Sequence, residues 1–176
     1  MSERFHLERL ARSHDRSSFR CSADEGTLQR YFTDDSRALR EHERGVCTVH
    51  VLLDDALAPP KIAGYFTLAS ETIVPAELPA AIAKKYPRYP RWGAVKLGRM
   101  ARDDGYAGEQ LGVTLVRAAF DVVLRSDAIG AIAMVVDAKN DRLARWYQNT
   151  CGFTPFAERP LMLFIMKPTM QSTARV

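Results

Sequence analysis

The stretch VKLGRMARDDGYAGEQLGVTLVRAAF, residues 95 to 120, decides the fold. It begins with a short run typical of a strand, passes through a turn that holds three glycines, and continues with apolar residues at helical spacing. We expect the strand over Val95–Ala101 and the helix over Leu111–Arg125. A strand that feeds a helix through a glycine turn is typical of sheets that carry helices on their faces.

The turn itself has the composition of a phosphate-binding turn. A helix N-terminus carries unpaired backbone N–H groups and a partial positive charge. Glycine lets such a backbone approach a phosphate oxygen closely, and Gly105, Gly108 and Gly112 provide that freedom. No GK[ST] or GxGxxG pattern is present, so this is neither a Walker A loop nor a Rossmann fingerprint. Taken alone, the three glycines also fit an ordinary connecting turn.

Strand and helix patterns alternate on both sides of this stretch. The other predicted strands are Phe5–Leu10, Val46–Leu53, Lys61–Ser70, Ile129–Val136, Phe153–Phe156 and Leu161–Met166. The other predicted helices are one or two within Glu25–Glu43, a short one from Pro75 to about Tyr86, and Asn140–Thr150. The order predicts an α/β (α+β) fold in one domain over residues 1–170, with a mixed central sheet, helices on both faces and a flexible tail at 171–176.

Composition sets broad limits on function. The 176 residues fit one domain, and 47% of them are hydrophobic, which is enough for a core. No apolar run is long enough to span a membrane, and the first residues do not resemble a signal peptide, so we expect a cytoplasmic protein. Cys21, Cys47 and Cys151 are far apart, which favours free thiols over disulfides or a metal site. The net charge of +4 permits an anionic partner without proving one.

A second motif, VVDAKNDRLARWYQNTCGF, spans residues 135 to 153. Asn140 is placed to cap the helix that follows it, and Gly152 suits the chain reversal at the end of that helix. Tyr147 lies on the helix, and Phe153 begins the next strand.

These two motifs, in this order, resemble those of the GNAT superfamily of N-acetyltransferases. In that family a strand binds the pantetheine arm of acetyl-CoA, and a turn of the form [QR]-x-x-G-x-[GA] surrounds its pyrophosphate. Ala107, Gln110 and Gly112 occupy the three defining positions here, and only Gly112 fits strictly. A side chain at Gln110 is tolerable if its φ is negative. The resemblance implies acetyl-CoA as co-substrate, no metal, and cofactor contacts from Met100, Ala101, Arg102, Ala107, Gly108, Glu109, Gln110, Leu111, Gly112, Val113 and Asn140.

The N-terminal half resembles one branch of that family, the toxins of toxin–antitoxin pairs that acetylate aminoacyl-tRNA. The similar segments are FRCSADEGTLQRYF (19–32), IAGYFTLAS (62–70), LPAAIAKKYPRYP (78–90) and VKLGRMARDD (95–104). The resemblance implies an aminoacyl-tRNA acceptor, an antitoxin protein as partner, and a homodimer.

The same resemblance places Tyr147 beside the sulfur of the thioester, where its phenol would donate a proton to the departing thiolate. The alternative is a core tyrosine whose hydroxyl is bonded to backbone. No general base is identifiable. Glu71 follows a predicted strand and either lines the cleft or, more commonly for such a residue, is a solvated strand end. His6, His14, His42 and His50 lie outside both motifs and are interpreted as surface or core residues.

The segment KKYPRYPRW, residues 84 to 92, interleaves basic and aromatic residues. Lys84, Lys85, Arg88 and Arg91 are candidates for contacts with the phosphates of a nucleic acid, and the aromatic rings for base stacking. Taken alone, the segment slightly favours the alternative, a proline-stiffened loop with solvated charges.

Three hypotheses on function follow. The first is an acetyltransferase toxin that acts on aminoacyl-tRNA, and the second is an N-acetyltransferase of a small molecule or a protein. The third, suggested by Ala107 and Gln110, is a non-catalytic module that binds acyl-CoA without turnover.

Overall fold

The structure is a computed structural model, and it describes residues 4–34, 37–126 and 130–174. Contacts divide the chain into two compact units. The first comprises Met1–Ala69 and Gly98–Ala119, and the second comprises Ser70–Leu97 and Phe120–Val176. Strands β3 (Lys61–Ile73) and β4 (Trp92–Arg102) and helix α4 (Leu111–Arg125) each contribute residues to both units.

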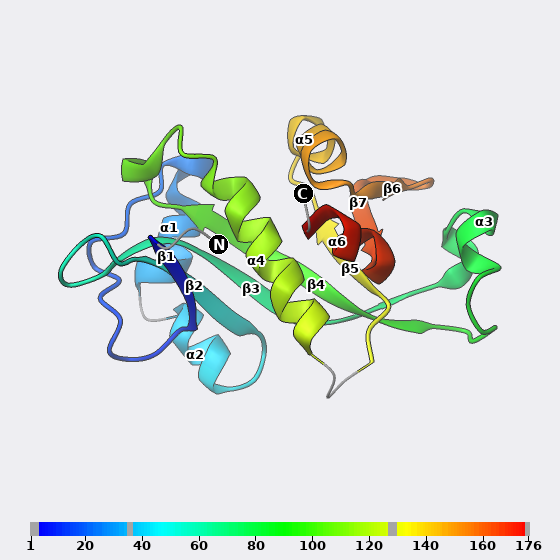
Figure 1. The fold of residues 1–176 in the computed structure, drawn as a ribbon, viewed down its shortest axis with the longest axis horizontal. Helices are drawn as coiled ribbons and strands as arrows, with labels where there is room; N and C mark the ends of the chain where they lie inside the picture. The colour runs from blue at the N-terminus through cyan, green and yellow to red at the C-terminus, as the bar shows by residue number, and fades with distance from the viewer. Residues whose placement is uncertain (1–3, 35–36, 127–129, 175–176) are drawn as a thin grey trace. The chain divides into compact units, whose positions relative to one another are not determined.

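The first unit is an antiparallel sheet region with helical cover. Its remaining elements are β1 (Phe5–Arg9), the 3₁₀ turn η1 (Ala23–Gly26), α1 (Thr27–Thr33), α2 (Arg37–Glu43), β2 (Thr48–Asp54) and η4 (Asp104–Tyr106). β1 pairs antiparallel with β2, and β2 pairs antiparallel with β3 (Figure 1). The two strands expected at Val46–Leu53 and Lys61–Ser70 therefore form an antiparallel hairpin.

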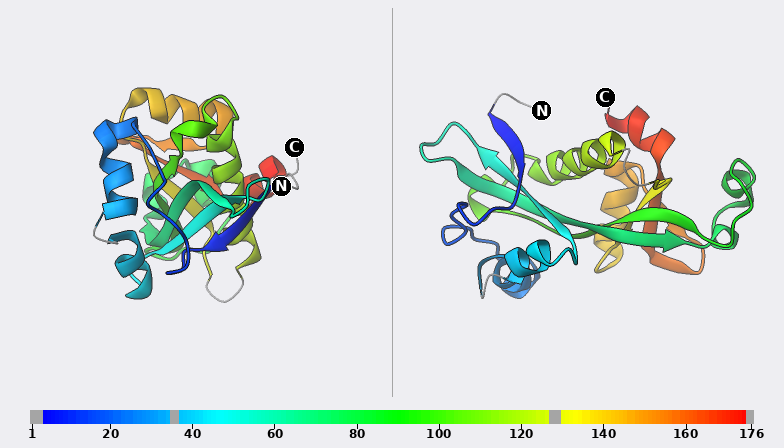
Figure 2. Two further views of the ribbon diagram at one scale, coloured as in Figure 1. Left: turned by 90° about the vertical axis from the view of Figure 1, so that its left-hand side faces the viewer. Right: turned by 90° about the horizontal axis from the view of Figure 1, so that it is seen from below.

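Helices cover both faces of β3 in this unit. A Cβ atom at Gly64 would lie 2.9 Å from Leu115 of α4, so α4 packs closely against this face. Tyr65 is fully buried in a core cluster with Tyr31 and Phe32 of α1. Because neighbouring residues of a strand point to opposite faces, α1 and α4 lie on opposite sides of β3 (Figure 2). The ring of Phe32 stacks on that of Tyr65 at 4.3 Å between centroids.

The second unit contains the parallel part of the sheet. Its remaining elements are η3 (Pro75–Glu77), α3 (Ala80–Ala83), β5 (Ala133–Asp137), α5 (Asp141–Cys151), β6 (Thr154–Phe156), β7 (Arg159–Met166) and α6 (Lys167–Ala174). β4 pairs parallel with β5, while β7 pairs antiparallel with both β5 and β6. Residues 133–136 of β5 are all buried, as their apolar run predicts.

The strand order is β1-β2-β3-β4-β5-β7-β6 in one mixed, seven-stranded sheet, so the predicted α/β class with a mixed central sheet is confirmed. Helix α4 has the predicted bounds, and the predicted strands are present with ends shifted by a few residues. In the described part of the chain, no helix is long and apolar enough to cross a membrane.

Two expectations differ from the structure, and one falls partly outside the residues that it describes. The short helix expected from Pro75 to Tyr86 consists of η3 and the single turn α3, separated by Pro79. α6 extends to Ala174, so residues 171–174 of the expected tail are helical. Ile129, the expected first residue of the strand that becomes β5, lies outside the described residues. The domain boundary at 170 stays a prediction.

Candidate active site

Four backbone N–H groups are free where α4 begins. Among the described residues, no hydrogen bond is donated by the N–H groups of Gly108, Gln110, Leu111 or Gly112. The first N–H groups of a helix have no partner within the helix, and together with its dipole they form an anion site. α4 is 15 residues long, so its dipole is well developed. The sequence-predicted phosphate turn thus has its donors in place.

The neighbouring N–H groups of the predicted contact set are already occupied. Ala107 donates to Asp104 at 3.2 Å, Glu109 to Tyr106 at 3.3 Å, and Val113 to Gln110 at 3.0 Å. These bonds hold the turn in shape, so the free donors belong to the residues between and after them.

Two residues of the turn have left-handed backbone. Gly108 has φ 87°, and Gln110 has φ 53°. The condition under which a side chain at Gln110 is tolerable, a negative φ, is therefore not met. The chain must reverse at this position to enter α4, and it does so with a residue that carries a Cβ, a conformation that costs about 1 kcal/mol or more. A glycine, which the family motif has here, would adopt this φ without strain.

Asp103 anchors the start of the turn. Its side chain is 1% exposed. One carboxylate oxygen accepts from Lys61 Nζ at 2.9 Å and from the N–H of Gly105 at 3.0 Å. The other accepts from the N–H of Arg20 at 2.7 Å. Three donors from three parts of the first unit therefore fix the point at which β4 ends.

A second buried carboxylate holds the middle of the turn. Asp54, at the end of β2, accepts a hydrogen bond from Tyr106 at 3.0 Å and two from Arg4 at 2.7 and 3.0 Å. The hydrogen bond from Arg4 lowers the pKa of Asp54 to about 2. Arg4 also bonds Glu109 at 3.0 Å. Neither Asp54 nor Arg4 could be found from the sequence, because no local pattern relates them to a turn so distant along the chain.

Strand β4 enters the turn through a close approach to β3. A Cβ at Gly98 would lie 2.5 Å from Thr67 Oγ1, and this hydroxyl accepts the N–H of Arg99 at 2.8 Å. Of the predicted pantetheine contacts, Ala101 is buried in the core, whereas Met100 and Arg102 are half-buried. Their role toward acetyl-CoA stays a prediction.

Tyr147 lies in the second unit, on α5. Asn140 caps this helix by accepting the N–H of Leu143 at 3.0 Å, and Gly152 ends it with φ 76°, so both predicted cap residues are confirmed. The Tyr147 side chain is 6% exposed, and its ring packs edge-on against Trp146 and Phe153 at 5.0 and 5.4 Å.

The hydroxyl of Tyr147 makes no hydrogen bond to any described residue, although the ring is buried. The alternative of a core tyrosine bonded to backbone is therefore not what the structure shows. Burial raises the pKa of Tyr147, so its phenol keeps its proton throughout the neutral range. A phenol whose O–H group is not already donating to another residue can give its proton to a substrate atom.

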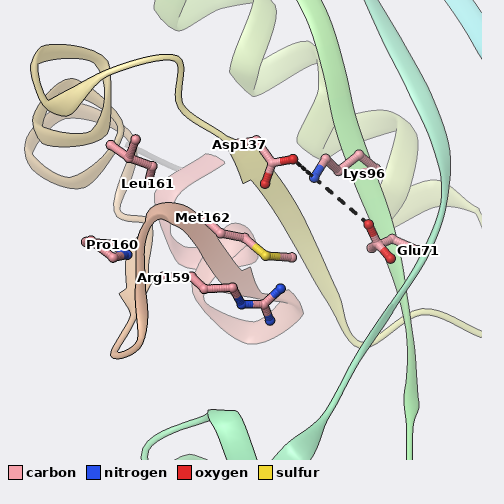
Figure 3. Close-up of a pocket in the computed structure, with 7 residues that line it drawn as sticks. All are labelled: Glu71, Lys96, Asp137, Arg159, Pro160, Leu161 and Met162. Atoms are coloured by element: carbon pink, nitrogen blue, oxygen red, sulfur yellow. Dashed lines mark hydrogen bonds and ion pairs between the residues drawn. The ribbon is translucent and has the colours of Figure 1, made fainter.

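Glu71 is not a solvated strand end. β3 extends past it to Ile73, and its side chain lines a cavity of about 550 Å³ within the second unit (Figure 3). Lys96 and Asp137 line the same cavity, and the sequence analysis assigned no role to either of them.

The segment 84–92 separates into an anchored part and an exposed part. Trp92 is buried, donates its indole N–H to the carbonyl of Pro87 at 3.0 Å, and packs on Tyr86 at 5.3 Å. Tyr89 is 64% exposed. The side chains predicted to contact substrate are all exposed: Lys84, Lys85, Arg88 and Arg91. Of the three aromatic residues, Tyr89 is therefore exposed, Tyr86 is half-buried and Trp92 is buried.

The cysteines and histidines singled out in the sequence lie in surroundings that explain them without a catalytic role. Cys21, Cys47 and Cys151 are free thiols, as expected, and burial raises the pKa of Cys21 and Cys47. His50 is buried against Phe66, and burial lowers its pKa to about 4. His6 and His14 bond Glu8 at the surface. Within the described residues, no group of three or more His, Cys, Asp or Glu side chains is arranged to hold a metal ion.

No protein-family model matches the chain. Several solved structures are similar over nearly its whole length. AtaT complexed with acetyl-methionyl-tRNAfMet is 27% identical, with a TM-score of 0.82, over 96% of this chain and 98% of that one. A Tyr-to-Phe variant of KacT is 25% identical, with a TM-score of 0.82, over 97% and 99%. AtaTR bound with acetyl-CoA is 26% identical, with a TM-score of 0.77, over 96% and 97%. The resemblance to GNAT toxins that the sequence predicted is confirmed at the level of structure.

Proposed function

We propose that this protein is an acetyl-CoA-dependent N-acetyltransferase that acts on the amino group of aminoacyl-tRNA. Binding of acetyl-CoA is supported by four backbone N–H groups that donate to no described residue. They belong to Gly108, Gln110, Leu111 and Gly112. They match the charge and the oxygen-rich surface of a pyrophosphate. AtaTR, a structural neighbour, has been solved with acetyl-CoA bound.

The chemical step needs a proton for the departing thiolate. The amine attacks the thioester carbonyl, the C–S bond breaks, and the thiolate takes the phenolic proton of Tyr147. The attacking nitrogen then loses a proton, which restores the phenol. Tyr147 suits this role because its hydroxyl forms no hydrogen bond with any described residue. Both AtaT and KacT have also been solved as variants with one tyrosine changed to phenylalanine.

The acceptor is inferred from two observations. AtaT has been solved with acetyl-methionyl-tRNAfMet, which has the form of an acetylated aminoacyl-tRNA. Lys84, Lys85, Arg88 and Arg91 are exposed on one short segment with Tyr89, so this segment offers cations to phosphates and a ring to a base. AtaT also binds an antitoxin, AtaR. An antitoxin partner and a homodimer stay predictions for this chain.

The deciding assay incubates the protein with acetyl-CoA and total charged tRNA, and then analyses the aminoacyl-adenosine by mass spectrometry. We expect an added acetyl group, and turnover that falls steeply as salt is raised. Reversing two charges in Lys84→Glu/Lys85→Glu should weaken turnover several-fold. Arg40→Glu/Arg44→Glu reverses the same number of exposed charges on and after α2, and should have a smaller effect.

The other two hypotheses are outcomes of the same assay. If spermidine or a peptide amine is acetylated and charged tRNA is not, the acceptor is a small molecule or protein. If acetyl-CoA binds but no acceptor is modified, the protein is a non-catalytic acyl-CoA-binding module.

A further inference from the structure

The cavity of about 550 Å³ in the second unit has two kinds of lining (Figure 3). One side is charged and comes from β3, β4 and β5. The other is largely apolar and comes from β7. The lining residues are Glu71, Lys96, Asp137, Arg159, Pro160, Leu161 and Met162.

The charged side carries one excess negative charge. Lys96 Nζ bonds Asp137 Oδ2 and lies 3.9 Å from Glu71 Oε2, so one ammonium group is shared by two carboxylates. Arg159 adds no net charge, because it forms an ion pair with Glu77. A ligand with one positive charge would complete the balance.

Asp137 has the capacity to bind such a ligand. Its side chain is 62% exposed, and its Oδ1 atom accepts no hydrogen bond from any described residue. Glu71 has less capacity, since one of its oxygens faces Lys96 and the other accepts the N–H of Thr72 at 2.9 Å. A carboxylate can accept several hydrogen bonds, so an incoming ammonium group need not displace Lys96.

The apolar side suits a hydrocarbon or thioether chain. Met162 of β7 is half-buried and points its thioether toward the charged residues (Figure 3), whereas Pro160 and Leu161 lie at the rim on the other side of the strand. A ligand that covers this surface gains free energy in proportion to the apolar area removed from water.

The cavity lies at the carboxyl end of a parallel strand pair. The register of β4 with β5 ends at Leu97 and Val136, next to Lys96 and Asp137. In sheets with parallel strands, ligands bind outside the carboxyl ends of the strands.

We propose that this cavity binds the aminoacyl group of the acceptor, with its α-ammonium at Asp137 and Glu71 and an apolar side chain on Met162. The inference rests on the proposed function, and it names the residues that select the substrate. Lys96 has a distinct part. Two carboxylates alone would hold the ammonium form strongly and oppose its loss of a proton, and Lys96 limits this by removing one of the two negative charges.

The test measures binding of L-methioninamide to the CoA-saturated protein by NMR titration, with N-acetyl-L-methioninamide as the uncharged comparison. Asp137→Asn and Glu71→Gln should each weaken binding of the amine, Asp137→Asn by about tenfold. Lys96→Met should strengthen it, because the net charge of the site becomes more negative. Glu158→Gln makes the same carboxyl-to-amide change next to Arg159, outside the cavity lining, and should leave affinity unchanged.

The same variants are then assayed with charged tRNA. Asp137→Asn should raise KM without changing KM for acetyl-CoA. Lys96→Met should lower KM and move the acidic limb of the kcat profile to higher pH, which damage to packing would not do. A higher KM for charged tRNA in Asp137→Asn together with a lower KM in Lys96→Met supports the inference.

Two results distinguish a failure of the cavity proposal from a failure of the proposed function. If the wild type acetylates charged tRNA but Asp137→Asn and Lys96→Met leave KM unchanged, the cavity is not the acceptor site and the proposed function stands. If the wild type acetylates no charged tRNA yet binds L-methioninamide through Asp137, the proposed function fails and the cavity remains an amine site. Equal binding of the acetylated amide overturns the role of charge.

Discussion

Replacing Tyr147 with phenylalanine tests whether this buried phenol is an acid or a packing residue. The ring keeps its contacts with Trp146 and Phe153, and the hydroxyl that is removed bonds to no described residue. No protein hydrogen bond is lost, so the free energy of unfolding should change by less than about 0.5 kcal/mol.

The effect on turnover should be large. Loss of a general acid lowers kcat by about 10²–10⁴, which corresponds to about 3–5 kcal/mol of transition-state stabilisation. KM for acetyl-CoA should change little, because the ring still packs. Initial rates of CoA release with charged tRNA as acceptor measure the first effect, and urea unfolding of the same preparations measures the stability.

Tyr65→Phe is the matched control, since it removes the hydroxyl of another buried tyrosine. That hydroxyl donates to the carbonyl of Leu28 at 2.8 Å, so its loss should cost about 1 kcal/mol of stability and leave kcat unchanged. Normal turnover by a folded Tyr147→Phe protein would refute the acid role. Loss of stability together with turnover would show instead that Tyr147 acts through packing.

Four further predictions concern the phosphate turn. Gly112→Asp should abolish calorimetric binding of acetyl-CoA, because its carboxylate repels phosphate, and unchanged affinity in a folded variant would remove the turn from the site. Gln110→Gly should raise the free energy of unfolding by up to about 1 kcal/mol by relieving the left-handed φ, and a clear loss would contradict the strain argument. Asp103→Asn should cost about 2–4 kcal/mol in urea unfolding, since its amide nitrogen must face one of three donors, and wild-type stability would rule out the anchor. Asp54 has a pKa lowered from 3.8 to about 2, so its contribution is present above pH 3.8 and lost as pH falls toward 2; the melting temperature of Asp54→Asn, followed over this range, should lack that component.

Much of the fold follows from local pattern. Helix α4 was predicted at Leu111–Arg125 and has these bounds, because a 3.6-residue apolar period extends over 15 residues. The caps of α5 were also predictable, since Asn140 and Gly152 act on backbone groups a few residues away. Short elements were less predictable: η3 and α3 were expected as one helix, and Pro79 divides them.

The candidate site residues likewise include some that were predictable from local sequence and some that were not. The turn that leads into α4 and the position of Tyr147 on a helix could be predicted from the sequence, because the turn requires glycine and a helix start within a few residues, and the tyrosine belongs to a recognisable motif. Which side chains of the segment 84–92 are buried and which are exposed could not be predicted. Its composition suggested three stacking rings, but Trp92 donates to Pro87 and packs on Tyr86, which leaves Tyr89 exposed.

By itself, the sequence determined which stretches form the strands and the long helices, where a glycine-containing turn leads into α4, and which family the chain resembles. Only the tertiary structure decided what supports and completes these parts. Asp103 bonds Arg20 across 83 residues of chain, and Lys96 bonds Asp137 across 41. Backbone preferences are set by residues a few positions apart, whereas the partner of a buried carboxylate, or the lack of a partner for the hydroxyl of Tyr147, depends on which distant segments the packed core brings together.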